Sequence, residues 1–185
     1  AIRGRGVGYF AHAMQTQIRS LRDSQNRLVE ASEQLDHLAH HDSLTEVANR
    51  QGLHRYLERA LSSRSKSKTQ ILLAHIDLDK FKSINDTYGH PVGDAVLKNA
   101  AKIMTDEFRT DALVARVGGD EFVIAASLDA DMDVSDGQRI CDHLVALLKA
   151  SMMANGVRCQ VGASIGFVTS PRHACSIDSL MTDAA

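Results

Sequence analysis

The sequence predicts an α/β sandwich that contains an antiparallel hairpin, rather than a doubly wound parallel sheet. Segments with helical and strand periodicity follow the order helix, strand, helix, strand, strand, helix, strand. Two β-rich runs, residues 113–117 and 122–127, are separated only by the glycine-rich stretch 118–121, which is a strong hairpin signal. With 185 residues, 44% of them apolar and 24% charged, the chain is large enough to bury a core.

Residues 1–40 predict a helix separate from the rest of the chain. Apolar side chains recur every seven residues, at Met14, Leu21, Leu28 and Leu35, with Ile18, Ala31 and Leu38 on neighbouring positions. A seam this narrow is typical of a two-stranded coiled coil, which would make the helix a homodimer contact. The alternative is a single amphipathic helix lying on its own domain, because the ladder is short.

The next elements follow from local patterns. A second helix is expected from residue 42 onward, with Asp42 or Ser43 as its N-cap. Residues 62–69 contain no apolar side chain and predict a solvated loop, and residues 71–77 are almost continuously apolar, as in a strand buried on both faces. Helical spacing then returns over 95–108.

The C-terminal half predicts the hairpin, a helix over 138–150 and a strand region over 158–169. In the hairpin, we expect Gly118 and Gly119 to supply the positive φ that tight turns require.

Composition excludes several classes of function. The 21 basic and 23 acidic residues nearly cancel, so nothing favours a nucleic-acid partner. Apolar runs are far shorter than the roughly 18 residues of a membrane span, and the three cysteines form no CxxC pair. We therefore expect a cytoplasmic domain with reduced thiols. Because the chain opens with Ala1 rather than Met, we expect upstream sequence, which could carry a membrane anchor.

Two acidic pairs predict a cation site. Asp77 and Asp79 follow the buried strand, and Asp120 and Glu121 occupy the tip of the glycine hairpin. Taken alone, the first pair would more often be a helix cap or a solvated turn. If the hairpin lies beside the first strand, however, Asp77 and Asp120 converge on one divalent ion, as in polymerase-type phosphoryl transfer.

Three blocks of sequence resemble the GGDEF family, the diguanylate cyclases. They are HDSLTEVANR at 41–50, DLDKFK at 77–82 with its continuation to residue 94, and RVGGDEF at 116–122. The match continues through residues 164–166. The resemblance implies a palm-like domain over 41–185, with a central, mostly antiparallel sheet flanked by helices, preceded by a signalling helix or coiled coil over 1–40.

The resemblance also implies an activity: condensation of two GTP molecules into cyclic di-GMP with release of two pyrophosphates. The enzyme would be a homodimer, with Mg²⁺ or Mn²⁺ as cofactor and a sensor domain upstream. The implied metal ligands are Asp77, the Leu78 carbonyl, Asp120 and Glu121. Asp120 would be the base for the 3′-hydroxyl, with Glu121 and Lys82 as further catalytic residues.

The implied GTP-binding residues are Asn85, His90, Asp94, Lys80, Phe81, Gly118 and Gly119. Asn85 and Asp94 would read guanine, because an amide offers both a donor and an acceptor while a carboxylate accepts from guanine N1 and N2 together. Adenine offers no such pair of donors. Without the flanking blocks, residues 85–90 would read as a helix end with a glycine cap and Gly93 as a turn.

Two rival functions stay open. A catalytically silent GGDEF domain would bind GTP or serve as a dimeric interaction module, and a related cyclase or polymerase would use ATP. The intact motif at 118–122 favours catalysis over the first rival, and Asn85 with Asp94 disfavours the second.

The chain departs from the family pattern at three places. Glu46 stands where the first block usually carries glycine, at the turn between the signalling helix and the domain. An RxxD product-inhibition site is incomplete, since Arg109 is present but Ala112 replaces the aspartate and Asp111 is displaced by one. The family's following helix, with its Lys and Arg for the GTP phosphates, lies beyond residue 185, so we expect a C-terminally truncated domain.

Other polar clusters are expected to be structural. The acidic run at Asp129, Asp131 and Asp133 lacks the glycine and glutamate of a calcium loop. The histidines at 37, 40 and 41 lack cysteine or carboxylate companions, and His75 is expected to be a satisfied core residue.

Overall fold

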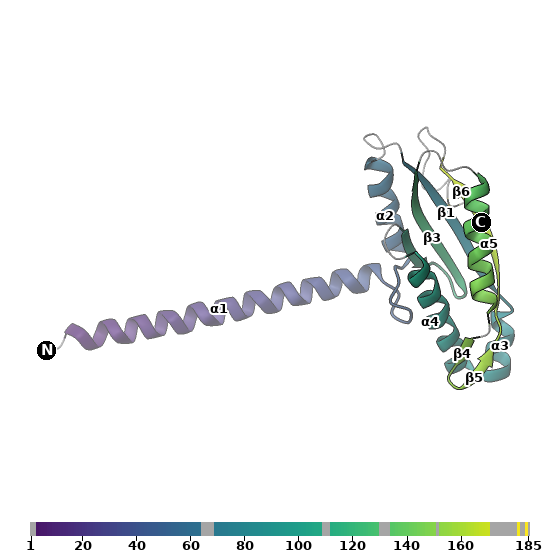
Figure 1. Ribbon diagram of the computed structural model, residues 1–185. Helices are drawn as coiled ribbons and strands as arrows, with labels where there is room; N and C mark the ends of the chain where they lie inside the picture. Colours follow the sequence, from purple (N-terminus) through teal and green to yellow (C-terminus); the bar gives the residue numbers. More distant parts are fainter. Residues whose placement is uncertain are drawn as a thin grey trace. The chain divides into compact units, whose positions relative to one another are not determined.

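The computed structural model describes residues 3–63, 69–108, 112–129, 134–150, 152–170, 181 and 184 (Figure 1). The chain divides into two compact units, Ala1–Ala39 and His40–Ala185, which are described separately. The elements are α1 (Arg3–His40), α2 (Arg50–Ser63), β1 (Thr69–Asp79), α3 (Phe81–Tyr88), α4 (His90–Glu107), β2 (Ala112–Arg116), β3 (Glu121–Asp129), α5 (Val134–Lys149), β4 (Met152–Ala154), β5 (Val157–Cys159) and β6 (Gly162–Thr169).

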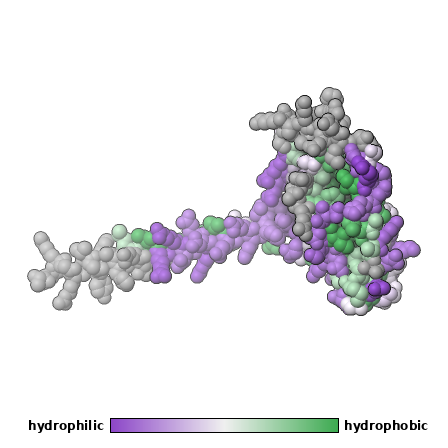
Figure 2. All heavy atoms as spheres, in the orientation of Figure 1, coloured by the Kyte–Doolittle hydropathy of each residue, from purple (hydrophilic) through white to green (hydrophobic). Residues whose placement is uncertain are grey.

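The first unit is the helix α1. Its described surface is mostly hydrophilic with small hydrophobic patches (Figure 2). The exposed large hydrophobic residues of the helix are Met14, Ile18, Leu21, Leu28, Val29, Leu35 and Leu38. Leu21, Leu28 and Leu35 are each about two-thirds exposed, at 66%, 71% and 67%. A helix with this exposed seam has apolar area available for a partner. No helix in the described part of the chain combines the length and apolarity needed to cross a bilayer.

The second unit is built on a sheet that, within the described residues, has four strands in the order β2-β3-β1-β6. Every neighbouring pair of strands is antiparallel. This confirms the predicted fold class, a mostly antiparallel sheet flanked by helices. β1 lies between β3 and β6, and a different hydrophobic cluster packs on each of its faces, so its run of residues is apolar on both faces.

Each face of the sheet packs in a separate hydrophobic cluster. Ile71 and Leu73 of β1 pack with Leu57 of α2 on one face. Ile76 and Leu78 belong to the larger cluster formed with α3, α4 and α5 on the other face. Side chains alternate along a strand, so odd-numbered residues of β1 lie on the face of α2 and even-numbered ones on the opposite face, where Leu72 belongs to a small separate cluster.

The predicted N-cap of the second helix, Asp42 or Ser43, is wrong. The helix begins at Arg50, not near Asp42. Asn49 caps it, because its Oδ1 accepts hydrogen bonds from the backbone N–H groups of Gln51 and Gly52, both at 2.9 Å.

Tertiary pairing explains why the helix starts late. The backbone N–H of Ala48 donates to the Val114 carbonyl at 3.1 Å, and that of Arg116 donates to the Ala48 carbonyl at 2.8 Å. Ala48 is thereby bridged in parallel to Ala115 of β2, which holds this part of the chain extended.

The predicted helix over 95–108 begins earlier, at His90, and a further helix, α3, precedes it. Gly89, with φ of 83°, separates the two, and its N–H donates to the Asn85 carbonyl at 2.9 Å. Pro91 stands in the first turn of α4, where its missing N–H costs no helical bond.

The predicted strand region over 158–169 also divides. Its last part, β6, joins the main sheet beside β1, whereas β5 pairs with β4 in a separate hairpin. Asn155 and Gly156 have φ of 48° and 80°, as a two-residue turn between right-twisted strands requires. Of the predicted loop over 62–69, residues 62 and 63 belong to α2 and Thr69 belongs to β1. Residues 64–68, Arg109, Asp111, Asp131, Asp133 and residues 171–180 lie outside the described residues.

Candidate functional site

Strand register brings the two acidic pairs to one edge of the sheet. Asp77 of β1 lies opposite Glu121, the first residue of β3. One residue further, the backbone N–H of Leu78 donates to the Asp120 carbonyl at 3.2 Å. The hairpin therefore does lie beside the first strand, and Asp77 and Glu121 project from the face of the sheet that α2 covers.

Burial and the neighbouring carboxylates both act on the pKa of Asp77. Burial, then the negative charges of Asp120, Glu121 and Asp79, raise the pKa of Asp77, and His75 opposes the shift. Carboxylates held together repel, so a bound cation would relieve an existing strain. His75, which the sequence predicts to be a satisfied core residue, is half-buried on β1.

A hard divalent cation fits the chemistry of these oxygens. Within the described residues, no group of three or more His, Cys, Asp or Glu side chains is placed so that it could hold a metal ion by itself. Mg²⁺ is commonly held by one or two carboxylates together with water and substrate phosphates, so two carboxylates suffice on the protein side. In an extended strand the N–H and C=O of one residue point the same way, so the Leu78 carbonyl also faces the Asp120 turn.

The glycines of the hairpin have a role other than the predicted one. Among described glycines only Gly89 and Gly156 have positive φ, so the turn does not depend on that property of Gly118 and Gly119. At Gly118, a Cβ would collide with the carboxylate of Glu121. At Gly119, a Cβ would meet nothing within 4 Å. Gly118 therefore makes room for Glu121, and Gly119 leaves the turn open to an approaching ligand.

Arg116 contacts both the hairpin turn at Gly119 and Asp42, which lies in the segment that follows α1. Its Nη1 lies 3.1 Å from Asp42 Oδ1, and its Nη2 and Nε donate to the Gly119 carbonyl at 2.7 and 3.3 Å. Arg50 adds a hydrogen bond from Nη2 to the Val117 carbonyl at 3.0 Å.

Asp42 is organised for this contact. Its Oδ1 accepts hydrogen bonds from the Thr45 amide at 2.9 Å and the Thr45 hydroxyl at 2.7 Å. Burial by itself would raise the pKa of Asp42, but the bonds from Thr45 and Arg116 outweigh burial and lower it. Sequence reasoning used these residues only to recognise a pattern. Their position in the first and third sequence blocks was the signal that could have pointed to their contact.

The backbone between β1 and α3 turns sharply at Lys80, which has φ of 60°. Its carbonyl accepts from the N–H groups of Ser83 and Ile84 at 2.9 and 3.3 Å. Lys82 is exposed on the first turn of α3, while Phe81 is buried in the larger core. Phe81 can therefore contribute to a ligand site through its backbone and not through its ring.

The predicted base-reading residues lie on two consecutive helices. Asn85 is half-buried on α3, and His90 and Asp94 are exposed on the first turns of α4. Asn155 in the β4–β5 turn supports this junction, because its Nδ2 donates to the Pro91 carbonyl at 2.8 Å.

A further polar residue, which the sequence showed only as part of the family match, borders the site. Ser164 of β6 lies opposite Asp77, and its hydroxyl donates to Asp79 Oδ1 at 2.7 Å. Gly162 makes space for the Asp79 carboxylate, which would meet any Cβ there. Asp79 is thus held toward β6.

Sequence comparison identifies relatives of the chain. The family model "Diguanylate cyclase, GGDEF domain" matches residues 39–185. Diguanylate cyclase TpbB of Pseudomonas aeruginosa (strain UCBPP-PA14) is 40% identical over 162 residues, which cover 86% of this chain and 37% of TpbB. The chain thus spans little more than a third of that relative's length.

Solved structures show the same fold. The GGDEF domain of TpbB from P. aeruginosa (PAO1) matches with a TM-score of 0.71 and 38% identity, covering 78% of this chain and 84% of that one. The coiled coil and GGDEF domain of DgcB from Caulobacter crescentus, in complex with c-di-GMP, matches with a TM-score of 0.82 and 26% identity, covering 93% of this chain and 90% of that one.

Proposed function

The chain belongs to the GGDEF family of diguanylate cyclases, and we propose that it condenses two molecules of GTP into cyclic di-GMP. In each half-reaction the 3′-oxygen of one GTP bonds to the α-phosphorus of the other. The bond to pyrophosphate breaks, and the 3′-hydroxyl proton passes to a base. The observation that carries the proposal is the register of β1 on β3, which sets Asp77 opposite Glu121 and beside the Asp120 turn.

We assign the roles as follows. Asp77, Asp120, Glu121 and the Leu78 carbonyl would hold Mg²⁺ or Mn²⁺, which when bound neutralises phosphate charge and orients the triphosphate. Asp120 is the candidate base. The exposed Lys82 would stabilise negative charge on the phosphates.

Guanine recognition falls to Asn85 and Asp94, with His90 beside the nucleotide. Backbone groups of Lys80, Phe81, Gly118 and Gly119 would approach the phosphates. Openness around Gly119 and the exposure of His90 and Asp94 support access for a ligand at these positions.

The second GTP must come from another protomer, so we propose a homodimer through the exposed apolar seam of α1. A coiled coil would raise the effective concentration of the facing domain. We propose a cytoplasmic location, because the substrate is GTP. We also propose a sensor domain upstream in the whole protein, since the chain spans only 37% of the length of TpbB.

The test is product formation by the purified chain. With GTP and Mg²⁺, we expect cyclic di-GMP and pyrophosphate in a ratio of one to two by chromatography and mass spectrometry. Asp120→Asn should abolish the product. Asp106→Asn is the matched control, because Asp106 pairs only loosely with Lys102 at 3.4 Å on the exposed side of α4.

Base specificity is tested separately. Asn85→Ala or Asp94→Ala should weaken GTP binding while leaving weak ATP binding unchanged. A wild-type chain that binds GTP but forms no product would be a silent GGDEF module, and equal loss of GTP and ATP binding would contradict guanine recognition.

A further inference from the structure

Gly93 occupies an unfavourable place for glycine. It is the fourth residue of α4, buried, and inside a helix of 18 residues. Glycine is the poorest helix former after proline, so a glycine here needs a reason in tertiary structure. Its φ is in the ordinary helical range and supplies no such reason.

The reason lies in the neighbouring helix. A Cβ at position 93 would collide with Oδ1 of Asn85 and lie 2.9 Å from its Cγ. The terminal amide of Asn85 therefore occupies the space that a side chain at position 93 would fill. The other close atom is Cζ of Phe81 at 3.3 Å, which a shift of a few tenths of an ångström would relieve.

We propose that Gly93 is a positioning residue for base recognition, because its missing side chain lets the Asn85 amide lie against α4. The inference rests on the proposed function, in which Asn85 reads guanine. An amide reads a base only when its donor and acceptor are both correctly aimed. The colliding atom is the free end of a flexible side chain, so a methyl group at position 93 would redirect the amide and leave the fold intact.

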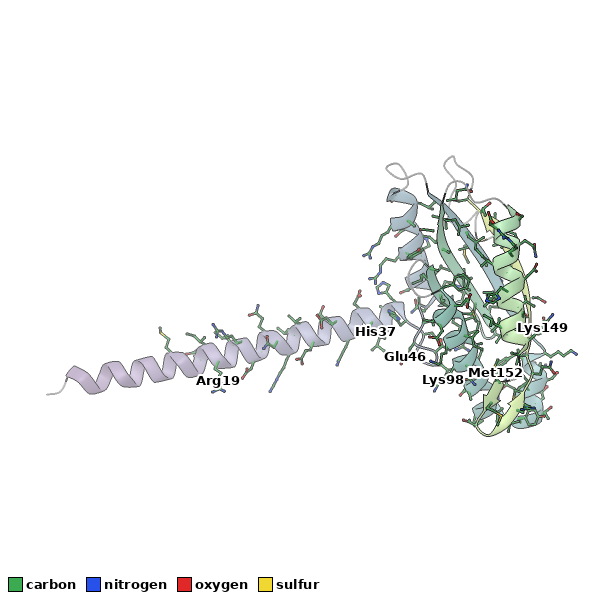
Figure 3. All side chains as sticks on the ribbon, in the orientation of Figure 1. Arg19, His37, Glu46, Lys98, Lys149 and Met152 are labelled. Atoms are coloured by element: carbon green, nitrogen blue, oxygen red, sulfur yellow. The ribbon has the colours of Figure 1, made fainter. Side chains whose placement is uncertain are left out.

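The experiment is a double-mutant cycle on the whole chain, with Gly93→Ala, Asn85→Ala and the two combined. Binding of guanosine 5′-O-(1-thiotriphosphate) with Mg²⁺ is measured by calorimetry, and KM and kcat for GTP are measured on the same variants. Lys98→Ala, an exposed substitution on α4, is the control (Figure 3).

We expect Gly93→Ala to weaken nucleotide binding about 5- to 10-fold, the loss of roughly one hydrogen bond. KM should rise and kcat at saturating GTP should stay within about twofold. In the Asn85→Ala background, Gly93→Ala should change binding less than about 1.5-fold, because it acts only through Asn85. Equal losses in both backgrounds, or no loss in the native background, would overturn the inference.

Thermal unfolding separates this inference from the proposed function. In the Asn85→Ala background, where the space is free, Gly93→Ala should raise Tm by about 2–4 °C through helix propensity. In the native background the rise should be smaller or absent. If the unmodified chain does not bind the nucleotide, the proposed function fails. In that case, if Gly93→Ala raises Tm equally in the native and Asn85→Ala backgrounds, the positioning role is also overturned. If the rise is larger in the Asn85→Ala background, the contact between position 93 and the Asn85 amide is supported.

Discussion

Replacing Arg116 with alanine should release the turn that carries Asp120. The substitution removes the ion pair with Asp42 and both hydrogen bonds to the Gly119 carbonyl. The side chains of Arg116 and Asp42 are only 15% and 22% exposed, so water replaces these contacts poorly. Arg116→Lys keeps the charge but cannot reach Asp42 and Gly119 together, because an ammonium lacks the planar fork.

The size of the effect follows from the burial. Breaking a fully buried ion pair costs about 3–5 kcal/mol. Here the pair is partly exposed and Asp42 keeps its bonds from Thr45, so we expect Arg116→Ala to lower the free energy of unfolding by about 2–3 kcal/mol and Arg116→Lys by about 1 kcal/mol. Displacing the turn should reduce kcat about 10- to 100-fold.

Urea unfolding followed by circular dichroism measures the first effect, and cyclic di-GMP formation measures the second. Arg139→Ala is the stability control. Arg139 pairs with Asp136 on α5 but is 77% exposed, so its loss should cost less than about 0.5 kcal/mol. If Arg116→Ala unfolds like the wild type and keeps its activity within twofold, the turn does not depend on this residue.

The effect should also depend on pH. Because the pKa of Asp42 is lowered in the folded state, its contribution is fully present above its ordinary value of 3.8 and is lost as pH falls through the lower folded value. The stability difference between wild type and Arg116→Ala should therefore hold from pH 7 to about 5 and shrink below 3.8. A difference that is constant down to pH 3 would contradict this origin.

Three other outcomes are expected. Asp77→Asn or Asp120→Asn should abolish product formation. Each should also raise Tm in the absence of metal, because it removes one negative charge from a group of carboxylates that repel one another. A lower Tm would count against this repulsion. Leu21→Glu with Leu28→Glu should lower activity at dilute protein more than at high concentration, and an unchanged sedimentation profile would show that the seam is no dimer contact. Glu46→Gly should raise the unfolding free energy by about 0.5–1 kcal/mol in urea, because Glu46 has φ of 64°, where glycine is favoured; a decrease would mean that the glutamate side chain stabilises its turn.

The sequence by itself determined the elements whose signals are local. The continuous apolar run of β1 predicted a strand buried on both faces, and the glycine-rich interruption predicted the hairpin of β2 and β3. Three ordered blocks established the family. These features depend on periodicity and on turn chemistry, which neighbouring residues decide among themselves.

Local signals misled where tertiary contacts compete with them. Asp42 is a good helix cap in isolation, yet backbone pairing of Ala48 with β2 keeps its segment extended and delays the helix to Arg50. The paired glycines predict a positive φ at Gly118, but in the structure Gly118 is required because a side chain there would collide with the Glu121 carboxylate. One residue type can serve several structural roles, and the residues that it contacts in the folded protein determine which role it has.

Only the tertiary structure decided how the site is assembled. Arg116 meets Asp42 across 74 positions of sequence, and Gly93 accommodates an amide from the preceding helix. Hydrophobic patterns specify which face of an element is buried, but they do not specify which polar groups meet at its ends. The contacts between these polar groups depend on strand register and helix packing, which follow from the balance of contacts over the whole domain.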